Sequence, residues 1–186
     1  MKIYIKNMVC IRCQIAVKYE LEKLGLHHTK IELGEVEIME DLSAEQRYNL
    51  SISLKNIGLE LINDKKNILV EKIRTIIIEL VHYTDHRIKI YLSDYLSEKL
   101  HQNYALLSNL FTELKGTTIE KYYLAQRLER AKELLMDDEL NLTDIAYKLN
   151  YSSVAHLSNQ FKKMTGVTPS QFKNLKYQKY HALEEV

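Results

Sequence analysis

The spacing of apolar residues changes along this chain of 186 residues. Near the N-terminus apolar side chains occupy every second position, as in Lys2-Ile3-Tyr4-Ile5-Lys6, which predicts half-buried strands. From about residue 64 they recur every third or fourth position, which predicts amphipathic helices. The pattern therefore predicts an α+β segment followed by an all-α segment.

Within the first segment the pattern predicts strands over residues 2–6, 30–33, 35–39 and 59–62, and helices over 14–24 and 43–57. Ser43 and Gln46 have the spacing of a capping box at the second helix. The resulting βαββαβ order is the ferredoxin-like plan. We expect this domain at residues 1–63, a helical domain at 64–178 and a C-terminal tail at 179–186. No Pro-, Gly- or Ser-rich tether separates the two domains, which predicts that they pack or couple rigidly.

Residues 142–173 predict two short helices joined by a tight turn, followed by a third helix. Asn141 can cap the first helix, and Asn150 can end it because asparagine tolerates a left-handed backbone. Leu157, Phe161 and Met164 are spaced to face inward on the second helix, which Gly166 should end. Such a pair is typical of a helix-turn-helix, whose second helix fits a major groove about 12 Å wide. It is equally typical of an ordinary helical hairpin.

An internal repeat favours the helix-turn-helix interpretation. Leu107-Ser108-Asn109-Leu110-Phe111 reappears 50 residues later as Leu157-Ser158-Asn159-Gln160-Phe161. The glycine and threonine that follow, Gly116 and Thr118, also have counterparts at that offset. Between the copies, residues 119–136 predict a helix roughly 27 Å long at about 1.5 Å per residue. That length is comparable to one turn of B-DNA, about 34 Å.

Three stretches of the helical segment carry a family resemblance: Leu124-Ala125-Gln126-Arg127-Leu128-Glu129-Arg130-Ala131-Lys132-Glu133-Leu134-Leu135, Asp144-Ile145-Ala146, and Phe161-Lys162-Lys163-Met164-Thr165-Gly166-Val167-Thr168-Pro169-Ser170-Gln171-Phe172. They resemble the DNA-binding domain of the AraC/XylS transcription regulators. The resemblance implies seven helices, with two helix-turn-helix units joined by a long linker helix. It also implies recognition helices in adjacent major-groove segments on one face of double-stranded DNA.

Aligning the two copies on their phenylalanines identifies the residues that we expect to face DNA. They are Ala105, Ser108 and Asn109 in the first copy, and Val154, Ala155, Ser158, Asn159, Lys162 and Lys163 in the second. Asparagine can form a bidentate pair with adenine, and small apolar side chains can contact a thymine methyl. The two lysines suit phosphate contacts. These residues predict an A/T-leaning site on double-stranded DNA. For Ser108 and Ser158 the alternative is that they are exposed to solvent and have no role in binding.

The chain has two cysteines, Cys10 and Cys13, in Met8-Val9-Cys10-Ile11-Arg12-Cys13 between the first strand and the first helix. Thiols near the start of a helix favour the thiolate. The placement resembles heavy-metal-associated domains, which implies a soft ion such as Cu(I) held by Cys10 and Cys13. The pair is alternatively a dithiol redox switch, or a vestigial pair in a domain kept for packing or dimerisation. Asn7 and Leu59 depart from the residues usual in that family, a glycine and an aromatic respectively.

Composition narrows the functional classes. Apolar residues make up 46% of the chain and the formal net charge is +1, so a packed core is expected but no bulk basic character. No apolar run approaches the roughly 20 residues that span a bilayer, and no signal peptide is evident, so we expect a cytoplasmic protein without membrane contact. The sequence shows no nucleophile-and-base pair and no phosphate loop, which argues against an enzyme.

The sequence thus predicts a sequence-specific DNA-binding transcription regulator that responds to a soft metal ion or to thiol redox state through Cys10 and Cys13. Two alternatives remain at this point. One is a chaperone-like metal-binding protein, and the other is an adaptor that contacts a protein rather than DNA.

Overall fold

A computed structural model describes residues 1–84 and 90–174 of the chain. The chain divides into two compact units. Unit 1 comprises residues 1–78 and 93–117, and unit 2 comprises residues 79–92 and 118–186. The predicted tail at 179–186 lies outside the described residues, as do 85–89 and 175–178.

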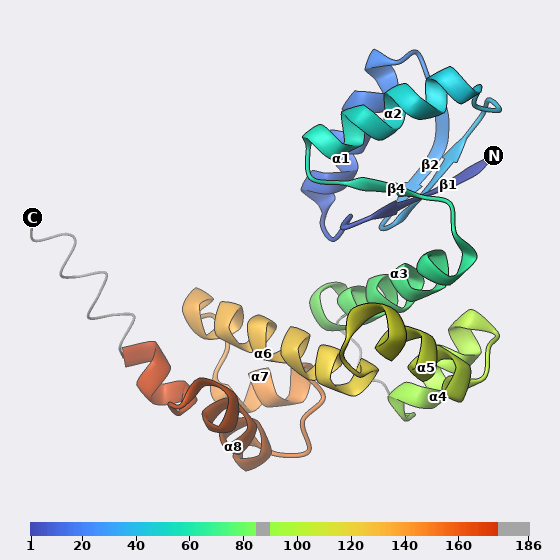
Figure 1. Cartoon of the computed structure of the whole chain (residues 1–186). Helices are drawn as coiled ribbons and strands as arrows, with labels where there is room; N and C mark the ends of the chain where they lie inside the picture. The colour runs from blue at the N-terminus through green and yellow to red at the C-terminus, as the bar shows by residue number, and fades with distance from the viewer. Residues whose placement is uncertain (85–89, 175–186) are drawn as a thin grey trace, which may run out of the picture. The chain divides into compact units, whose positions relative to one another are not determined.

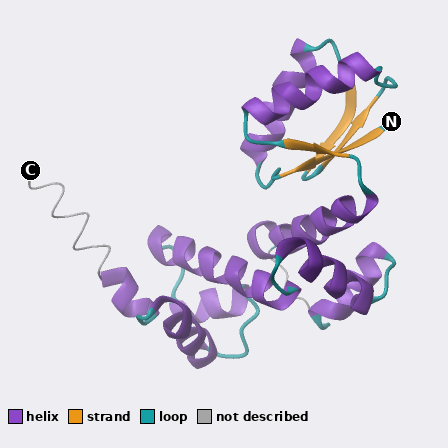
Figure 2. Cartoon of the chain, in the orientation of Figure 1, coloured by secondary structure: helices purple, strands orange, loops and turns teal. Residues whose placement is uncertain are grey.

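Unit 1 begins with a small α/β module (Figures 1 and 2). Its elements are β1 (Lys2–Lys6), α1 (Ile11–Lys23), β2 (His28–Glu32), β3 (Glu35–Ile38), α2 (Ala44–Asn56) and β4 (Glu60–Ile62). The four strands form one sheet in the order β2-β3-β1-β4, and all neighbouring strands are antiparallel. The element order and the Ser43–Gln46 capping box are as predicted, whereas α1 starts three residues before the predicted helix and β2 two residues before the predicted strand.

Alternation along the strands builds the core of this module. Ile3 and Ile5 on β1 and Val36 and Ile38 on β3 are buried, because every second side chain points to the same face of a sheet. Helices α1 and α2 cover that face and contribute Val17, Leu21, Leu50 and Leu54 (Figure 1). Met8, from the loop after β1, is also buried in this core.

The opposite face of the sheet meets α3 (Lys65–Ile78), which follows β4 after two residues. Tyr4 lies on this face, and the Lys72 ammonium sits 4.9 Å from the centre of its ring. Lys72 also pairs with Glu35 on β3 at 3.5 Å, and Lys2 pairs with the same carboxylate. Burial tends to raise the pKa of Glu35, but the hydrogen bond from Lys2 and the charge of Lys72 outweigh burial and lower it. These contacts hold α3 against the sheet.

Gly34, in the turn between β2 and β3, also lies close to α3. Its φ is +76°, a conformation that glycine adopts without strain. A Cβ atom at Gly34 would lie 2.9 Å from Oγ1 of Thr75 on α3. The glycine therefore permits the close approach of helix and turn.

The remaining elements are helical. In unit 1, α4 (Leu92–Leu100) leads to α5 (Tyr104–Lys115), which packs on α3. Unit 2 contains η1 (Glu79–Tyr83), α6 (Ile119–Asp137), α7 (Leu142–Lys148), α8 (Val154–Thr165) and a helical stretch at 169–174. Residues 79–83 are π-helical, and the hydroxyl of Thr84 donates to the Glu79 carbonyl at 3.0 Å.

Candidate nucleic-acid interface and thiol pair

The first helix-turn-helix consists of α4 and α5 in unit 1. Asn103 caps α5, and its side-chain oxygen accepts from the backbone N–H of Ala105 at 2.8 Å. Leu107, Leu110 and Phe111 are buried, which fixes the inward face of α5. The predicted DNA contacts therefore lie outward: Ala105 and Asn109 are exposed, and Ser108 is half-buried.

The second helix-turn-helix consists of α7 and α8 in unit 2. Asn141 caps α7 through bonds from the N–H groups of Thr143 and Asp144, at 2.9 and 3.0 Å. Asn150 has φ +61°, which confirms the predicted left-handed residue in the turn. Ser153 caps α8, and its hydroxyl accepts from the N–H of His156 at 3.1 Å.

On α8, Leu157 and Phe161 are buried as expected. Met164, expected to face inward, is 42% exposed instead. The inward row continues at a spacing of four to Thr165, whose hydroxyl donates to the Phe161 carbonyl at 2.8 Å. Met164 precedes Thr165 by one residue and lies at the boundary of the inward face of α8. The predicted DNA contacts on α8 occupy the outward side: Ala155, Asn159, Lys162 and Lys163 are exposed, and Val154 and Ser158 are half-buried.

The two copies match as structures as well as sequences. Helices α5 and α8 begin and end at positions 50 residues apart. Gly116 and Gly166 end them with φ values of +67° and +83°. Thr118 and Thr168 then accept from N–H groups three residues later, each at 3.2 Å, and so cap the next helix. Each unit thus holds one helix-turn-helix with the same inward and outward faces.

A stack of side chains braces the turn of the second helix-turn-helix. The Arg127 guanidinium of α6 lies 3.7 Å from the ring centre of Tyr151 and 5.2 Å from that of Tyr123. Tyr151 is buried, and burial raises the pKa of its hydroxyl. A guanidinium over an aromatic face is attractive, so this contact ties the turn between α7 and α8 to the long helix α6.

His156 is a candidate contact that the sequence analysis missed. It is exposed in the first turn of α8, where recognition helices approach base edges. Its Nδ1 is 2.9 Å from the Ser152 hydroxyl, and its ring meets Tyr151 edge-on at 5.2 Å. Both contacts orient the imidazole and leave Nε2 as the outer nitrogen. The pattern Ser152-x-x-x-His156 around a helix start was the signal in the sequence.

The two cysteines lie together at the start of α1. Their sulfur atoms are 3.4 Å apart, both side chains are half-buried, and Cys10 is the N-cap residue in an extended conformation. The backbone N–H of Cys13, its thiol and the charge of Arg12 outweigh burial and lower the pKa of Cys10. Asn7 has φ +68°, so asparagine replaces glycine here in a conformation that both residues tolerate.

The donor set of this pair determines which ions suit it. Two adjacent sulfurs, one with a lowered pKa, suit a soft ion held by two thiolates. The side chain of Met8 is only 2% exposed and is buried in the apolar core. Its thioether is therefore not counted among the ligands of the thiol pair. Within residues 1–84 and 90–174, no group of three or more His, Cys, Asp or Glu side chains could hold a metal ion. A closed four-ligand zinc site therefore has too few ligands in the described part of the chain.

Comparison with known proteins concerns the helical part. Residues 96–174 match the family model described as a helix-turn-helix domain. An uncharacterized HTH-type transcriptional regulator of Bacillus subtilis, YtdP, is 29% identical over 125 residues, which are 66% of this chain and 16% of that protein. The chain thus spans less than a fifth of the length of this relative. Among the described residues, no helix is long and apolar enough to cross a membrane.

Two solved structures share the fold. The C-terminal domain of AraT, a response regulator from Geobacillus stearothermophilus, is 26% identical with a TM-score of 0.52, covering 60% of this chain and 88% of that one. The DNA-binding domain of AdpA, solved with a target DNA, is 16% identical with a TM-score of 0.51, covering 59% of this chain and 94% of that one. Residues 96–174 therefore form a helix-turn-helix domain of the kind found in AraC-type DNA-binding domains, and the relatives that the chain resembles are transcription regulators rather than enzymes.

Proposed function

We propose that this protein is a transcription regulator that binds double-stranded DNA through α5 and α8. The repeated helix-turn-helix carries the proposal: each copy buries one helix face and leaves small and amide side chains on the other, and the second copy adds the exposed Lys162 and Lys163. Support comes from the fold that AdpA shares, since that domain was solved bound to DNA. An adaptor that contacts a protein instead would not need these two surfaces to match.

The residues proposed to read DNA are those predicted from the repeat, with His156 added. Asn109 and Asn159 would pair with adenine, while Ala105, Val154 and Ala155 would contact thymine methyl groups. Lys162 and Lys163 would contact phosphates. Ser108 and Ser158 lie between these positions on the same sides of α5 and α8. An A/T-leaning operator follows from this set.

Selection from a random duplex library with the full chain tests the proposal. We expect enrichment of sites with adenine at the positions that the asparagines contact, and affinity that falls steeply with salt. Asn49→Ala on α2, which removes an exposed asparagine of the α/β module, serves as the control and should select the same sites as wild type. Absence of binding to any duplex at about 50 mM salt would remove the proposal, and selection of mainly guanine would remove the residue assignment.

We further propose that the α/β module, as a ferredoxin-like domain of the heavy-metal-associated type at residues 1–63, is the sensing part of the regulator. Cys10 and Cys13 would hold a soft ion such as Cu(I), or would switch between dithiol and disulfide. Support comes from the lowered pKa of Cys10 and the short distance between the sulfurs. If the protein were instead a chaperone-like metal-binding protein, the repeated helix-turn-helix would have no function in that role.

Comparing wild type with a Cys10→Ser, Cys13→Ser variant tests the sensing proposal. Both proteins are titrated with Cu(I), Zn(II) and an oxidant, and bound metal, free thiols and DNA affinity are measured. We expect one equivalent of Cu(I), or one disulfide, in wild type alone, with a change in DNA affinity. If both proteins respond alike, these thiols are not the sensor.

A further inference from the structure

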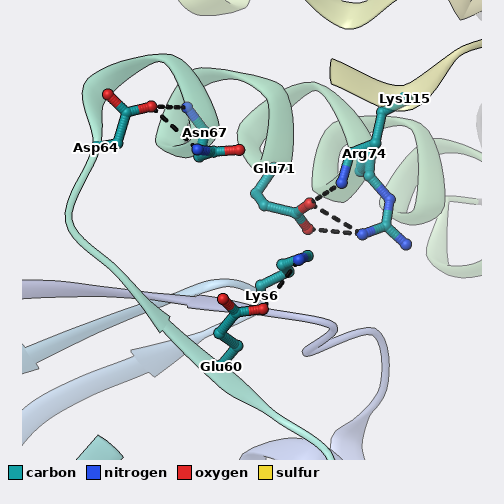
Figure 3. A network of polar contacts seen from close by, with 7 residues as sticks. All are labelled: Lys6, Glu60, Asp64, Asn67, Glu71, Arg74 and Lys115. Atoms are coloured by element: carbon teal, nitrogen blue, oxygen red, sulfur yellow. Dashed lines mark hydrogen bonds and ion pairs between the residues drawn. The ribbon is translucent and has the colours of Figure 1, made fainter.

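Glu71 stands out in unit 1 as a buried charge to which the proposed function assigns no role. Its side chain is only 9% exposed, although glutamate is rarely buried unless it is paired. Arg74, one turn further along α3, donates to both carboxylate oxygens at 3.0 and 2.7 Å. Lys115 from α5 donates to Oε1 at 2.6 Å (Figure 3). The carboxylate of Glu71 thus forms ion pairs with one cation from α3 and one from α5.

This arrangement ties the recognition helix of the first helix-turn-helix to α3. Lys115 is in the last turn of α5 and is 21% exposed, so solvent screens the pair only partly. A second ion pair, Lys66 with Glu113 at 3.5 Å, also joins these helices. Both of its side chains are nearly 60% exposed, so it contributes little to the stability of the helix pair. Glu71 therefore provides the better-shielded of these two polar links between α3 and α5.

The same helix also contacts the sheet. Lys72 follows Glu71 and pairs with Glu35 and the Tyr4 ring, while Thr75 lies against Gly34. Next to this, Lys6 donates to Glu60 at 2.9 Å, which lowers the pKa of Glu60; the charge of Lys115 adds a smaller lowering (Figure 3). Lys6 immediately precedes Asn7, whose carbonyl oxygen is 3.9 Å from the Cys13 sulfur. The sheet and α5 thus both contact α3, and the loop that carries the thiol pair continues directly from strand β1 of this sheet.

We propose that Glu71 couples the α/β module to α5, so that a change in how the sheet holds α3 alters DNA affinity. The inference rests on the proposed function, because it requires α5 to contact DNA. The bistable element is the triad of Glu71, Arg74 and Lys115: moving α3 separates the carboxylate from Lys115 and releases the end of α5. Removing the charge of Glu71 removes the link and leaves both helices in place.

A double-mutant cycle on the full chain tests the coupling, using the duplex selected with wild type. Gly34→Ala perturbs the contact between the sheet and α3, because the added Cβ would clash with Thr75. The β-branched side chain of Thr75 has few other rotamers with which to avoid that clash. Gly58→Ala is the matched control: its φ is +79°, close to that of Gly34, but no atom lies within 4 Å of the added Cβ. Both changes carry a similar backbone cost, and only the first displaces α3. Glu71→Gln removes the charge at constant shape.

We expect Gly34→Ala to lower DNA affinity at least about fivefold and Gly58→Ala less than twofold. In the Glu71→Gln background, Gly34→Ala should change affinity less than twofold. Equal effects of the two glycine variants, or the same effect of Gly34→Ala with and without Glu71, would overturn the coupling. If Gly34→Ala fails to fold, Lys72→Met replaces it, and Lys115→Met likewise replaces Glu71→Gln. Loss of DNA binding by wild type would instead overturn the proposed function itself.

Discussion

Single positions on α5 and α8 are where base recognition would reside. Asn109 and Asn159 occupy equivalent exposed positions, and the buried phenylalanine two residues after each fixes which way they face. An amide can donate to one adenine atom and accept from another, which no lysine or arginine can do. Identity at these two positions should therefore matter more than the charge of the whole surface.

Replacing either asparagine should relax base preference. We expect Asn109→Ala and Asn159→Ala to lose about 1–3 kcal/mol of discrimination for adenine at one position each. Arginine at the same position should shift preference to guanine, because its fork matches guanine O6 and N7. Repeating the duplex selection with each variant measures this. An unchanged adenine preference in both alanine variants would contradict the assignment.

At the thiol pair, the lowered pKa of Cys10 predicts a pH dependence. The thiolate is the reactive form, so the midpoint of the rise in alkylation rate by iodoacetamide should lie below the ordinary cysteine pKa of about 8.5. The sign for stability follows: a depressed pKa favours the folded state above the unfolded value, and this contribution is lost as pH falls through the folded pKa. Alkylation rates of Cys10 in wild type, with the labelled residue identified by mass spectrometry, measure the midpoint. A midpoint at or above that of a free cysteine peptide would refute it.

At the scale of elements, the duplicated helix pairs depend on one aromatic anchor each. Phe111 and Phe161 are fully buried, whereas Met164 on the same helix as Phe161 is 42% exposed. Phe161 also meets Phe172 edge-to-face at 5.4 Å, which connects α8 to the helical stretch after it. Loss of a buried ring removes both apolar burial and packing around it.

Phe161→Ala should therefore lower the free energy of unfolding by about 3–5 kcal/mol. Met164→Ala, the matched control on α8, should cost less than about 1 kcal/mol because its side chain stays largely in water. Denaturant titrations followed by circular dichroism measure both. A cost for Met164→Ala as large as that for Phe161→Ala would show that the inward row on α8 is misassigned.

Local chemistry explains which elements were predictable. Asn141, Asn150, Gly116 and Gly166 act on their own backbone, so their roles as helix caps and ends could be predicted from the sequence. The contact of Arg127 with Tyr151 joins residues distant in sequence, which no spacing reveals. The Glu71 triad was missed for the same reason: its lysine lies 44 residues away.

For the whole molecule, a net charge of +1 means that affinity for DNA cannot come from bulk attraction. It must come from cations placed where phosphates pass, and Lys162 and Lys163 are exposed in the last turn of α8. Several acidic residues elsewhere are occupied in ion pairs, such as Glu35 with Lys2 and Lys72. Salt dependence therefore reports on few residues.

Each phosphate contact contributes about −0.9 to the slope of log affinity against log salt. Lys162→Gln with Lys163→Gln should make that slope shallower by about 2, with base preference unchanged. Lys18→Gln on α1, whose exposed lysine pairs with Glu22, serves as the control and should leave the slope unaltered. Fluorescence anisotropy from about 50 to 200 mM salt covers the range. An unchanged slope in the double variant would exclude these lysines from the phosphate contacts.

Strand β1 lies inside the sheet and pairs with two strands that follow it in the sequence. Its register joins Lys2 to Glu37 on β3 and Tyr4 to Ile62 on β4. Because such distant pairings cannot form until both partners have been synthesised, β1 stays unpaired until most of the module has emerged from the ribosome. Slow translation through β4 would prolong that wait, so synonymous codons there should influence the yield of folded protein.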